Sequence, residues 1–187
     1  SFYNVFISFD VDTAVHNNNI RDILYRTLFT GNDSLINDAL SEKTGYIYNF
    51  SSFLEQYSNI GRFCFDYEIE KENLVKSIEA VVNVLNQIKS GDFDLESQIR
   101  KEMNSIEFML DDIDDLNWTM AYNGHILEGK NINFEEILSN KCKDIDLEAV
   151  MSAARDIFSK RNLTLNIGGN KKHIDVEKIG KITDLLN

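Results

Sequence analysis

The residues best suited to catalysis or metal binding are scattered along this chain of 187 residues. Its three histidines, His16, His125 and His173, lie far apart in the sequence. No H-x-x-E-H or H-E-x-x-H pair presents two imidazoles on one helix face to a zinc ion. No G-x-S-x-G turn or phosphate-binding glycine loop is present, since Gly168-Gly169 lacks the rest of a dinucleotide motif. The residues therefore predict no catalytic set and no metal site.

Two acidic groups could suggest a cation site. Asp10 and Asp12 alternate along a predicted strand, and we interpret them as polar positions on the exposed face of an edge strand. The other group is a run near the end of a predicted helix, which we interpret as the solvated face of that helix: Asp111, Asp112, Asp114 and Asp115. His125 is predicted to be a solvated or capping histidine at a helix end.

The composition restricts the class of partner. With 43% hydrophobic residues and 12 Phe the chain can bury a full core. Its net charge of -12 repels phosphate backbones and anionic lipids, so we expect neither nucleic-acid nor membrane binding. No apolar run approaches the ~20 residues that span a bilayer, and no basic segment precedes the first strand, so no signal peptide is expected. Cys64 and Cys142 form no CxxC pair and are predicted to be reduced, and we expect a cytoplasmic protein.

Hydrophobic periodicity predicts the order of the elements. Alternating residues predict strands at 2–12, 46–54, 60–69 and 162–167, with Tyr46, Tyr48 and Phe50 on one side of the second and a polar loop at 55–59. Helical spacing predicts six helices, which begin near residues 20, 34, 72, 95, 133 and 145. The fourth carries an apolar stripe that continues to Leu116 and Met120 and ends near Gly124. The last places Leu147, among others, on its inward face.

This order predicts an α+β fold with a mainly antiparallel sheet and helices packed on one face. Residues 46–54 and 60–69 are expected to form an antiparallel hairpin, because only about five residues join them. We predict one domain over residues 1–169, followed by residues 170–187 as a polar, weakly helical tail of the same domain.

Residues 31–50, GNDSLINDALSEKTGYIYNF, resemble the insulinase/pitrilysin family of zinc peptidases, which includes the mitochondrial processing peptidases. In that family a helix ends in glycine, and Ser-Ser-x-Leu then opens a short helix. A Leu-Arg-Glu-Lys segment follows, then a glycine, and a tyrosine three residues later. The matching positions here are Gly31, Asp33-Ser34-Leu35-Ile36, Leu40-Ser41-Glu42-Lys43, Gly45 and Tyr48. Residues 145–150 and 162–168 resemble a helix start and closing strand of the family, so the resemblance covers about 1–169.

The resemblance implies a metallohydrolase domain like that of mitochondrial processing peptidase, of the C-terminal type without zinc. In this family one domain carries the zinc motif, and the facing half supplies an arginine and a tyrosine that hold the peptide substrate. Tyr48 matches the tyrosine and is the predicted substrate-binding residue, whereas Ser41 stands at the arginine position and offers no charged fork. The chain could therefore belong to the zinc-bearing polypeptide, or be a half without a catalytic role. The alternative for Tyr48 is a strand aromatic packed under a helix.

Three functions follow as hypotheses. The first is a non-catalytic domain of an insulinase-family zinc metallopeptidase, which forms part of the peptide-enclosing chamber and contacts other domains or subunits. Its partners would be an N-terminal zinc-bearing domain, or a partner subunit of the same family, and a peptide substrate. Zinc is expected in the partner domain and not in this chain, which alone is predicted to be inactive. The alternatives are an inactive scaffold subunit on the same fold and an unrelated acidic peptide-binding module.

Overall fold

The computed structural model describes residues 2–57, 59–112, 114, 142–143 and 145–187. The chain divides into two compact units, one of Ser1–Phe93 with Leu147–Asn187 and one of Asp94–Asp146. In the second unit the predicted long helix is present as α4 (Leu95–Asp111). Several predictions lie outside the described residues: the continuation of that stripe to Leu116 and Met120, its end at Gly124, Asp115, His125 and the helix at 133–139.

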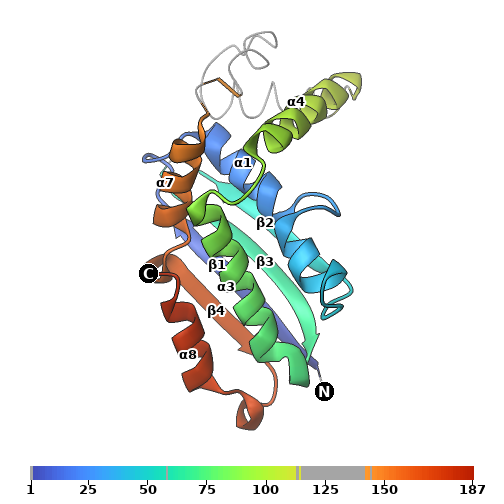
Figure 1. The fold of residues 1–187 in the computed structure, drawn as a ribbon, viewed down its shortest axis with the longest axis vertical. Helices are drawn as coiled ribbons and strands as arrows, with labels where there is room; N and C mark the ends of the chain where they lie inside the picture. Colours follow the sequence, from blue (N-terminus) through green and yellow to red (C-terminus); the bar gives the residue numbers. More distant parts are fainter. Residues whose placement is uncertain (1, 58, 113, 115–141, 144) are drawn as a thin grey trace. The chain divides into compact units, whose positions relative to one another are not determined.

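The first unit is built on one four-stranded antiparallel sheet (Figure 1). Its strands are β1 (Phe2–Val11), β2 (Phe50–Gln56), β3 (Gly61–Glu70) and β4 (Leu163–Gly168), in the order β2-β3-β1-β4. The predicted α+β class and the antiparallel hairpin are confirmed. β1 is not an edge strand, because it pairs with β3 on one side and with β4 on the other. Our interpretation of Asp10 as an edge position is therefore wrong.

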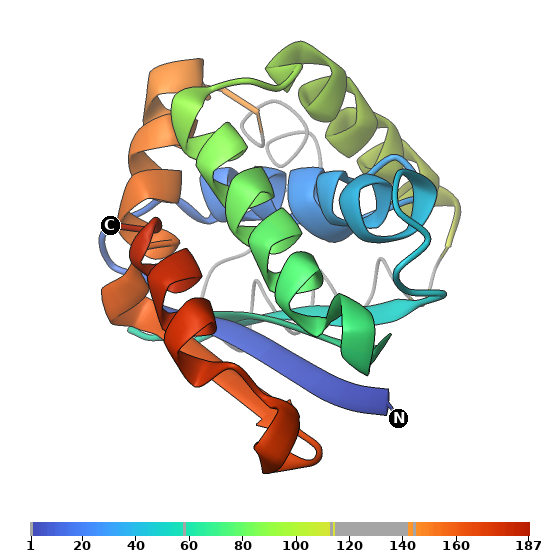
Figure 2. The ribbon, with the colours of Figure 1, turned by 60° about the horizontal axis from the view of Figure 1, so that its bottom comes forward.

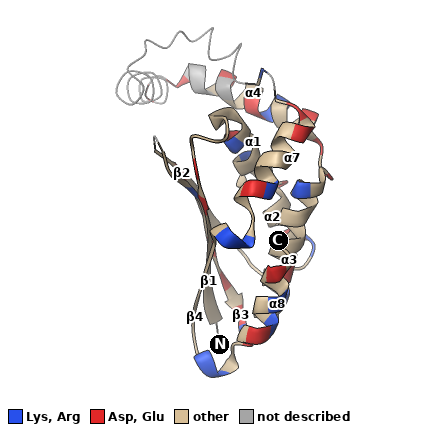
Figure 3. Cartoon of the chain, turned by 90° about the vertical axis from the view of Figure 1, so that its left-hand side faces the viewer, with Lys and Arg blue, Asp and Glu red and all other residues tan. Residues whose placement is uncertain are grey.

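The helices of this unit lie on one side of the sheet (Figures 2 and 3). They are α1 (Asn18–Phe29), α2 (Leu35–Asn37), α3 (Leu74–Ser90), α7 (Leu147–Ile157) and α8 (Val176–Asp184). Short turns extend or join them: the π-helical turn η1 (Asp38–Glu42) and the 3-10 turns η2 (Lys71–Asn73), η4 (Lys160–Asn162) and η5 (Lys171–His173).

The core lies between this helical layer and one face of the sheet. Alternate residues of β1 and β3 are buried there, as the period of two predicts: Tyr3, Val5, Ile7, Phe9, Phe63, Phe65, Tyr67 and Ile69. Phe158, just after α7, packs edge-on against Phe9 and Phe63, with ring centroids 5.3 Å away in both cases. One inward prediction is wrong, since Leu147 in the first turn of α7 is exposed.

The second strand begins later than its alternation predicts. The backbone N–H groups of Tyr46 and Ile47 both donate to the carbonyl of Leu40, at 2.9 and 3.1 Å. These residues therefore complete the end of the preceding helix, and β2 begins only at Phe50. The predicted loop at 55–59 is also shorter, because Glu55 and Gln56 still pair with β3.

The predicted tail, residues 170–187, contains the helix α8, which packs against α3 of the same unit. Ile179, Ile182 and Leu186 are buried, and α8 lies against α3. The Lys89 ammonium donates to the carbonyl of Leu186 at 2.7 Å, and burial lowers the pKa of Lys89 to about 8. Within the part of the chain that the structure describes, no helix is long and apolar enough to cross a membrane.

Candidate functional site

The stretch that joins α1 to β2, residues 30–49, holds the two positions singled out by the family resemblance, Ser41 and Tyr48. We call it the α1–β2 segment. It turns away from α1 at Gly31, whose φ of 88° lies in the left-handed region. Ser34 then precedes α2 in extended conformation, but its side chain makes no capping hydrogen bond. Ile36 and Leu40 are fully buried and hold the segment to the core.

The middle of the segment is a π-helical turn. The N–H of Lys43 donates to the carbonyl of Asp38, five residues back, at 2.8 Å. Thr44 Oγ1 closes the turn by donating to the carbonyls of Ala39 and Leu40, each at 3.0 Å. Such turns are rare and occur frequently at functional sites. The sequence pattern predicts an ordinary helix here, because the apolar spacing that buries Ile36 and Leu40 does not distinguish the two.

The end of the segment presents Tyr48 to solvent. Gly45 reverses the chain with a φ of 61°, and its N–H donates to the carbonyl of Ser41 at 2.7 Å. Ile47 is buried and the ring of Phe50, two residues after Tyr48, lies 6.4 Å from that of Phe29, so the backbone is anchored on both sides of Tyr48. Tyr48 itself has a relative exposure of 102%. The alternative interpretation of Tyr48, a strand aromatic packed under a helix, is therefore wrong.

Ser41 and Tyr48 are thus carried by one continuous turn. Ser41 lies in η1 and is half-buried, and its hydroxyl makes no hydrogen bond with the described residues. The Tyr48 hydroxyl likewise makes none within the part of the chain that the structure describes. Both polar side chains are therefore available to a ligand, although neither carries a positive charge.

A hollow of about 250 Å³ lies between the α1–β2 segment and α3. An ion pair between Lys43 and Asp38, 2.6 Å apart, forms part of its wall. The remaining lining is mixed in polarity: Leu35, Ala39 and Thr44 from the segment, and Ala80, Asn83, Val84 and Gln87 from α3. Sequence reasoning missed this hollow, because it depends on how closely two helices approach.

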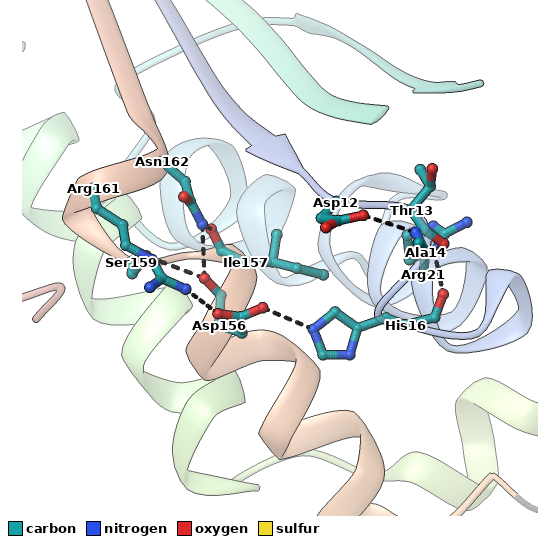
Figure 4. A network of polar contacts seen from close by, with 10 residues as sticks. All are labelled: Asp12, Thr13, Ala14, His16, Arg21, Asp156, Ile157, Ser159, Arg161 and Asn162. Atoms are coloured by element: carbon teal, nitrogen blue, oxygen red, sulfur yellow. Dashed lines mark hydrogen bonds and ion pairs between the residues drawn. The ribbon is translucent and has the colours of Figure 1, made fainter. Parts of the chain in front are cut away.

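A second cluster of polar residues surrounds the opposite end of α1, and we call it the Arg21 network (Figure 4). Arg21 is only 1% exposed, although sequence reasoning assigned it no role. Its guanidinium donates to the side chain of Gln56 at 2.8 Å, to the carbonyl of Thr13 at 3.2 Å, and to the His16 carbonyl and Asn18 side chain. Burial lowers the pKa of Arg21, and the charge of the neighbouring Asp22 carboxylate opposes this shift in part.

The same cluster contains a His–Asp pair. His16 Nε2 lies 3.0 Å from Asp156 Oδ2, and Arg161 donates to the other carboxylate oxygen (Figure 4). A nucleophile is not aimed at the imidazole, because Ser159 Oγ donates to the backbone carbonyl of Asp156 at 3.1 Å. The pair joins the β1–α1 loop to the end of α7, so we assign it a structural role.

The remaining candidates for metal binding are separated. Asp10 accepts a hydrogen bond from Arg62 Nε at 2.7 Å, and Asp12 Oδ1 accepts one from the N–H of Ala14. His173 is exposed in η5. Across residues 2–112 and 142–187, as far as they are described, no three His, Cys, Asp or Glu side chains gather as metal ligands would. Cys64 has a free, buried thiol, as predicted, and burial raises its pKa to about 11.

Comparison with known families gives one match. The family model described as "Peptidase M16 inactive domain" matches residues 4–101, which include β1 to β3, the α1–β2 segment and α3. No curated protein matches the chain.

Solved structures share the fold at low sequence identity. The peptidase M16 inactive domain from Pseudomonas fluorescens is 11% identical with a TM-score of 0.74, over 91% of this chain and 42% of that one. A protease from Helicobacter pylori is 18% identical with a TM-score of 0.71, over 89% and 40%. A chain of complex III2 from Candida albicans is 11% identical with a TM-score of 0.71, over 97% and 46%. The present chain thus spans less than half the length of each of these three.

Proposed function

Because the chain belongs to the peptidase M16 inactive-domain family, we propose that it is a non-catalytic domain of an insulinase-family zinc metallopeptidase. In this proposal the domain forms part of the wall around a bound peptide and contacts a zinc-bearing domain, on the same polypeptide or on a partner subunit. The observation that carries the proposal is the match over residues 4–101, together with the antiparallel sheet and its single helical layer. The earlier resemblance to the insulinase/pitrilysin family is thereby confirmed.

Tyr48 is the proposed substrate contact. Its full exposure supports this role, because a tyrosine ring and hydroxyl can both contact a peptide at little entropic cost. The backbone on either side is held by Ile47 and by the Phe50–Phe29 ring contact, so the side chain is presented from a fixed position. Ser41 lies at the position of the family arginine and would add only a neutral hydroxyl.

The test is reconstitution with the zinc-bearing polypeptide encoded in the same or an adjacent gene. We expect peptide hydrolysis that needs both parts and is lost on chelation, whereas this chain alone neither cleaves peptides nor binds stoichiometric zinc. Tyr48→Ala should reduce kcat/KM about tenfold, a typical loss for one well-placed contact. Tyr57→Ala is the matched control, since Tyr57 is also an exposed tyrosine but lies in the β2–β3 turn. Equal losses in the two variants would remove Tyr48 from the site.

The second candidate is an inactive scaffold subunit on the same fold. The serine at position 41 favours this candidate, because the chain then lacks the arginine that holds the peptide substrate together with the tyrosine in the family. Stable association with a family partner that shows no hydrolysis in any combination would support this candidate. Ser41→Arg is expected to create no activity in the isolated chain, and measurable turnover of that variant alone would contradict both candidates.

The cytoplasmic location stays a prediction. The free, buried thiol of Cys64 agrees with it, because persistent disulfides are typical of oxidising compartments. Fractionation of cells that express the native gene would test it.

A further inference from the structure

The hollow between the α1–β2 segment and α3 is large enough to hold a small ligand. At about 30 Å³ of liquid volume for each water molecule, its volume of about 250 Å³ equals about eight waters, or a ligand of about eight non-hydrogen atoms. Its walls belong to one unit, and the buried side chains of Ile36, Leu40 and Leu85 fix the two elements that form them. The chemistry of these walls therefore indicates which ligand fits.

Among the described residues that line the hollow, only Asp38 and Lys43 are charged, and they form an ion pair at 2.6 Å. Five residues are about 1.4 turns of an α-helix, so a regular helix would point these two side chains in different directions. In η1 the N–H of Lys43 donates instead to the carbonyl of Asp38 at 2.8 Å, and the side chains meet. The π turn thus places a carboxylate and an ammonium next to each other in the wall.

Both charged groups keep capacity for further hydrogen bonds. The ion pair uses Oδ2 of Asp38, so Oδ1 can accept from a ligand, and the Lys43 ammonium has three N–H donors on a side chain that is 71% exposed. On α3, the Asn83 amide makes no hydrogen bond with any described residue. Gln87 donates from Nε2 to the carbonyl of Asp92 at 2.8 Å and keeps its own oxygen as an acceptor. A ligand can therefore bind without breaking the ion pair.

The adjacent charges restrict the class of ligand. An anion would be repelled by the Asp38 carboxylate and a cation by the Lys43 ammonium. An uncharged apolar molecule would displace water from both groups without replacing its hydrogen bonds. A zwitterion satisfies both, with its ammonium on Asp38 and its carboxylate on Lys43. Because the two protein charges are adjacent, those of the ligand must be adjacent too, as they are in an α-amino acid.

The apolar part of the lining indicates the side chain of the ligand. Leu35 and Ala39 from the segment, and Ala80 and Val84 from α3, contribute aliphatic groups. An aliphatic side chain gains free energy when such groups remove it from water. Valine and leucine also have about the size of the hollow.

We propose that the hollow between the α1–β2 segment and α3 binds a free aliphatic α-amino acid as its zwitterion. This goes beyond the proposed function, because neither Ser41 nor Tyr48 lines the hollow and binding needs no zinc-bearing partner.

The test is a titration of the isotope-labelled chain with leucine at neutral pH, followed by amide chemical shifts. We expect shifts that saturate at millimolar leucine, since so few atoms contact the protein, and that are largest in residues 35–44 and 80–87. Isocaproate keeps the carboxylate and side chain of leucine but has no ammonium, and isoamylamine keeps the ammonium and side chain but has no carboxylate. Each should bind about fivefold more weakly than leucine, the upper value for an exposed ion pair. Equal binding of either analogue, or the largest shifts elsewhere in the chain, would overturn the proposal.

Variants assign the two ends of the ligand. Asp38→Asn removes the partner of the ammonium, so it should weaken leucine about fivefold without weakening isocaproate. Lys43→Gln should likewise weaken leucine without weakening isoamylamine. The matched control is Glu177→Gln, which breaks the exposed ion pair with Lys181 on α8, also 2.6 Å long, and should change leucine binding less than twofold. If Asp38→Asn and Lys43→Gln weaken leucine and both analogues alike, the ion pair only supports the fold and the proposal is rejected.

The aliphatic wall has its own test. Glycine is the same zwitterion without a side chain and should bind about tenfold more weakly than leucine. Ala80→Leu fills the hollow, keeps a residue that favours helix, and should abolish the leucine shifts. Circular dichroism verifies that this variant is folded. Glycine binding as tightly as leucine, or unchanged leucine affinity in the folded Ala80→Leu variant, would contradict the proposal.

The inference and the proposed function can fail separately. A chain that supports hydrolysis with the zinc-bearing partner but does not bind leucine would reject the amino-acid site and keep the proposed function. Leucine binding that is selective over both analogues, without hydrolysis or association in any reconstitution, would do the reverse.

Discussion

The regions at the two ends of α1 differ in whether their polar side chains have hydrogen-bond partners within the protein. At its start, the Arg21 guanidinium is buried and donates its hydrogen bonds to backbone and side-chain acceptors of the protein itself. At its end, the α1–β2 segment buries the hydroxyl of Ser34 without a partner among the described residues and leaves Tyr48 in solvent. Polar groups that already bind one another stabilise the fold, whereas groups without partners can bind a ligand.

The same contrast applies to the residues that most resemble a catalytic group, to which we assign a structural role. His16, Asp156 and Ser159 lie together and are the residue types of a hydrolytic triad, but their hydrogen bonds join loop to helix. Tyr48 has no chemical partner in the described chain, yet its backbone is anchored on both sides. We therefore use stability measurements to test the first region, and measurements on the complex to test the second.

The largest expected effect is at the Arg21 network. Arg21→Met would leave buried carbonyl and amide acceptors, including the Gln56 side chain, without a donor, and should lower the free energy of unfolding by about 3 kcal/mol. Urea denaturation measures this. Lys76→Met, an exposed change of the same chemistry on α3, is the control and should change stability by less than about 0.5 kcal/mol. Equal effects would show that the network is not structural.

A smaller effect is expected at the turn of the α1–β2 segment. Gly45→Ala places a Cβ where no atom lies within 4 Å, so the cost is only that of a left-handed backbone, about 1 kcal/mol. If hydrogen exchange shows that residues 40–47 open before the rest, the variant should raise their exchange rates most. A loss of several kcal/mol in the free energy of unfolding would contradict this, because the variant would then disturb more than the backbone conformation of the turn.

The effect of Ser34→Ala on stability distinguishes between a capping serine and a buried serine without a partner. A serine that caps a helix loses about 1 kcal/mol on replacement by alanine. Here the hydroxyl is buried without a capping bond, so Ser34→Ala should be neutral or stabilising by up to about 1 kcal/mol. Thermal unfolding of the two proteins side by side decides between them. A lower Tm in the variant would show that the hydroxyl does have a partner.

The smallest effect on stability is expected at Tyr48. Because its side chain touches little of the fold, Tyr48→Ala should change the free energy of unfolding by less than about 0.5 kcal/mol. Together with the loss of kcat/KM expected in the reconstituted peptidase, this would assign the residue to binding. A substantial loss of stability would return Tyr48 to a packing role.

Residue patterns predicted most of the first unit. The alternation over β1 and β3 identified the buried residues, because a strand has only two faces and the apolar side chains must share one. The helical spacing of apolar residues likewise predicted α3, and the Ser90-Gly91 pair predicted its end, where Gly91 has a left-handed backbone. The pattern failed at residues 46–49, where Tyr46 and Tyr48 alternate as in a strand but the backbone bonds back to Leu40.

The candidate site was predicted only in part. The motif located Tyr48 within residues 31–50, but the exposure of Tyr48, the π turn and the adjoining hollow were not predictable from it. Arg21 was missed altogether, since an arginine on a polar helix face usually reaches solvent. Its acceptors come from Thr13 and Gln56, which are far apart in sequence and meet only in the folded chain.

The sequence by itself determined which residues enter the core, where most helices end and which family the chain resembles, because these depend on local periodicity, turn residues and short motifs. Only the tertiary structure decided that β1 is an interior strand, that Arg21 is enclosed and that Tyr48 stands free. These properties depend on which distant groups satisfy a given hydrogen-bond donor or cover a given side chain. Such pairs of distant groups meet only when the chain folds and packs.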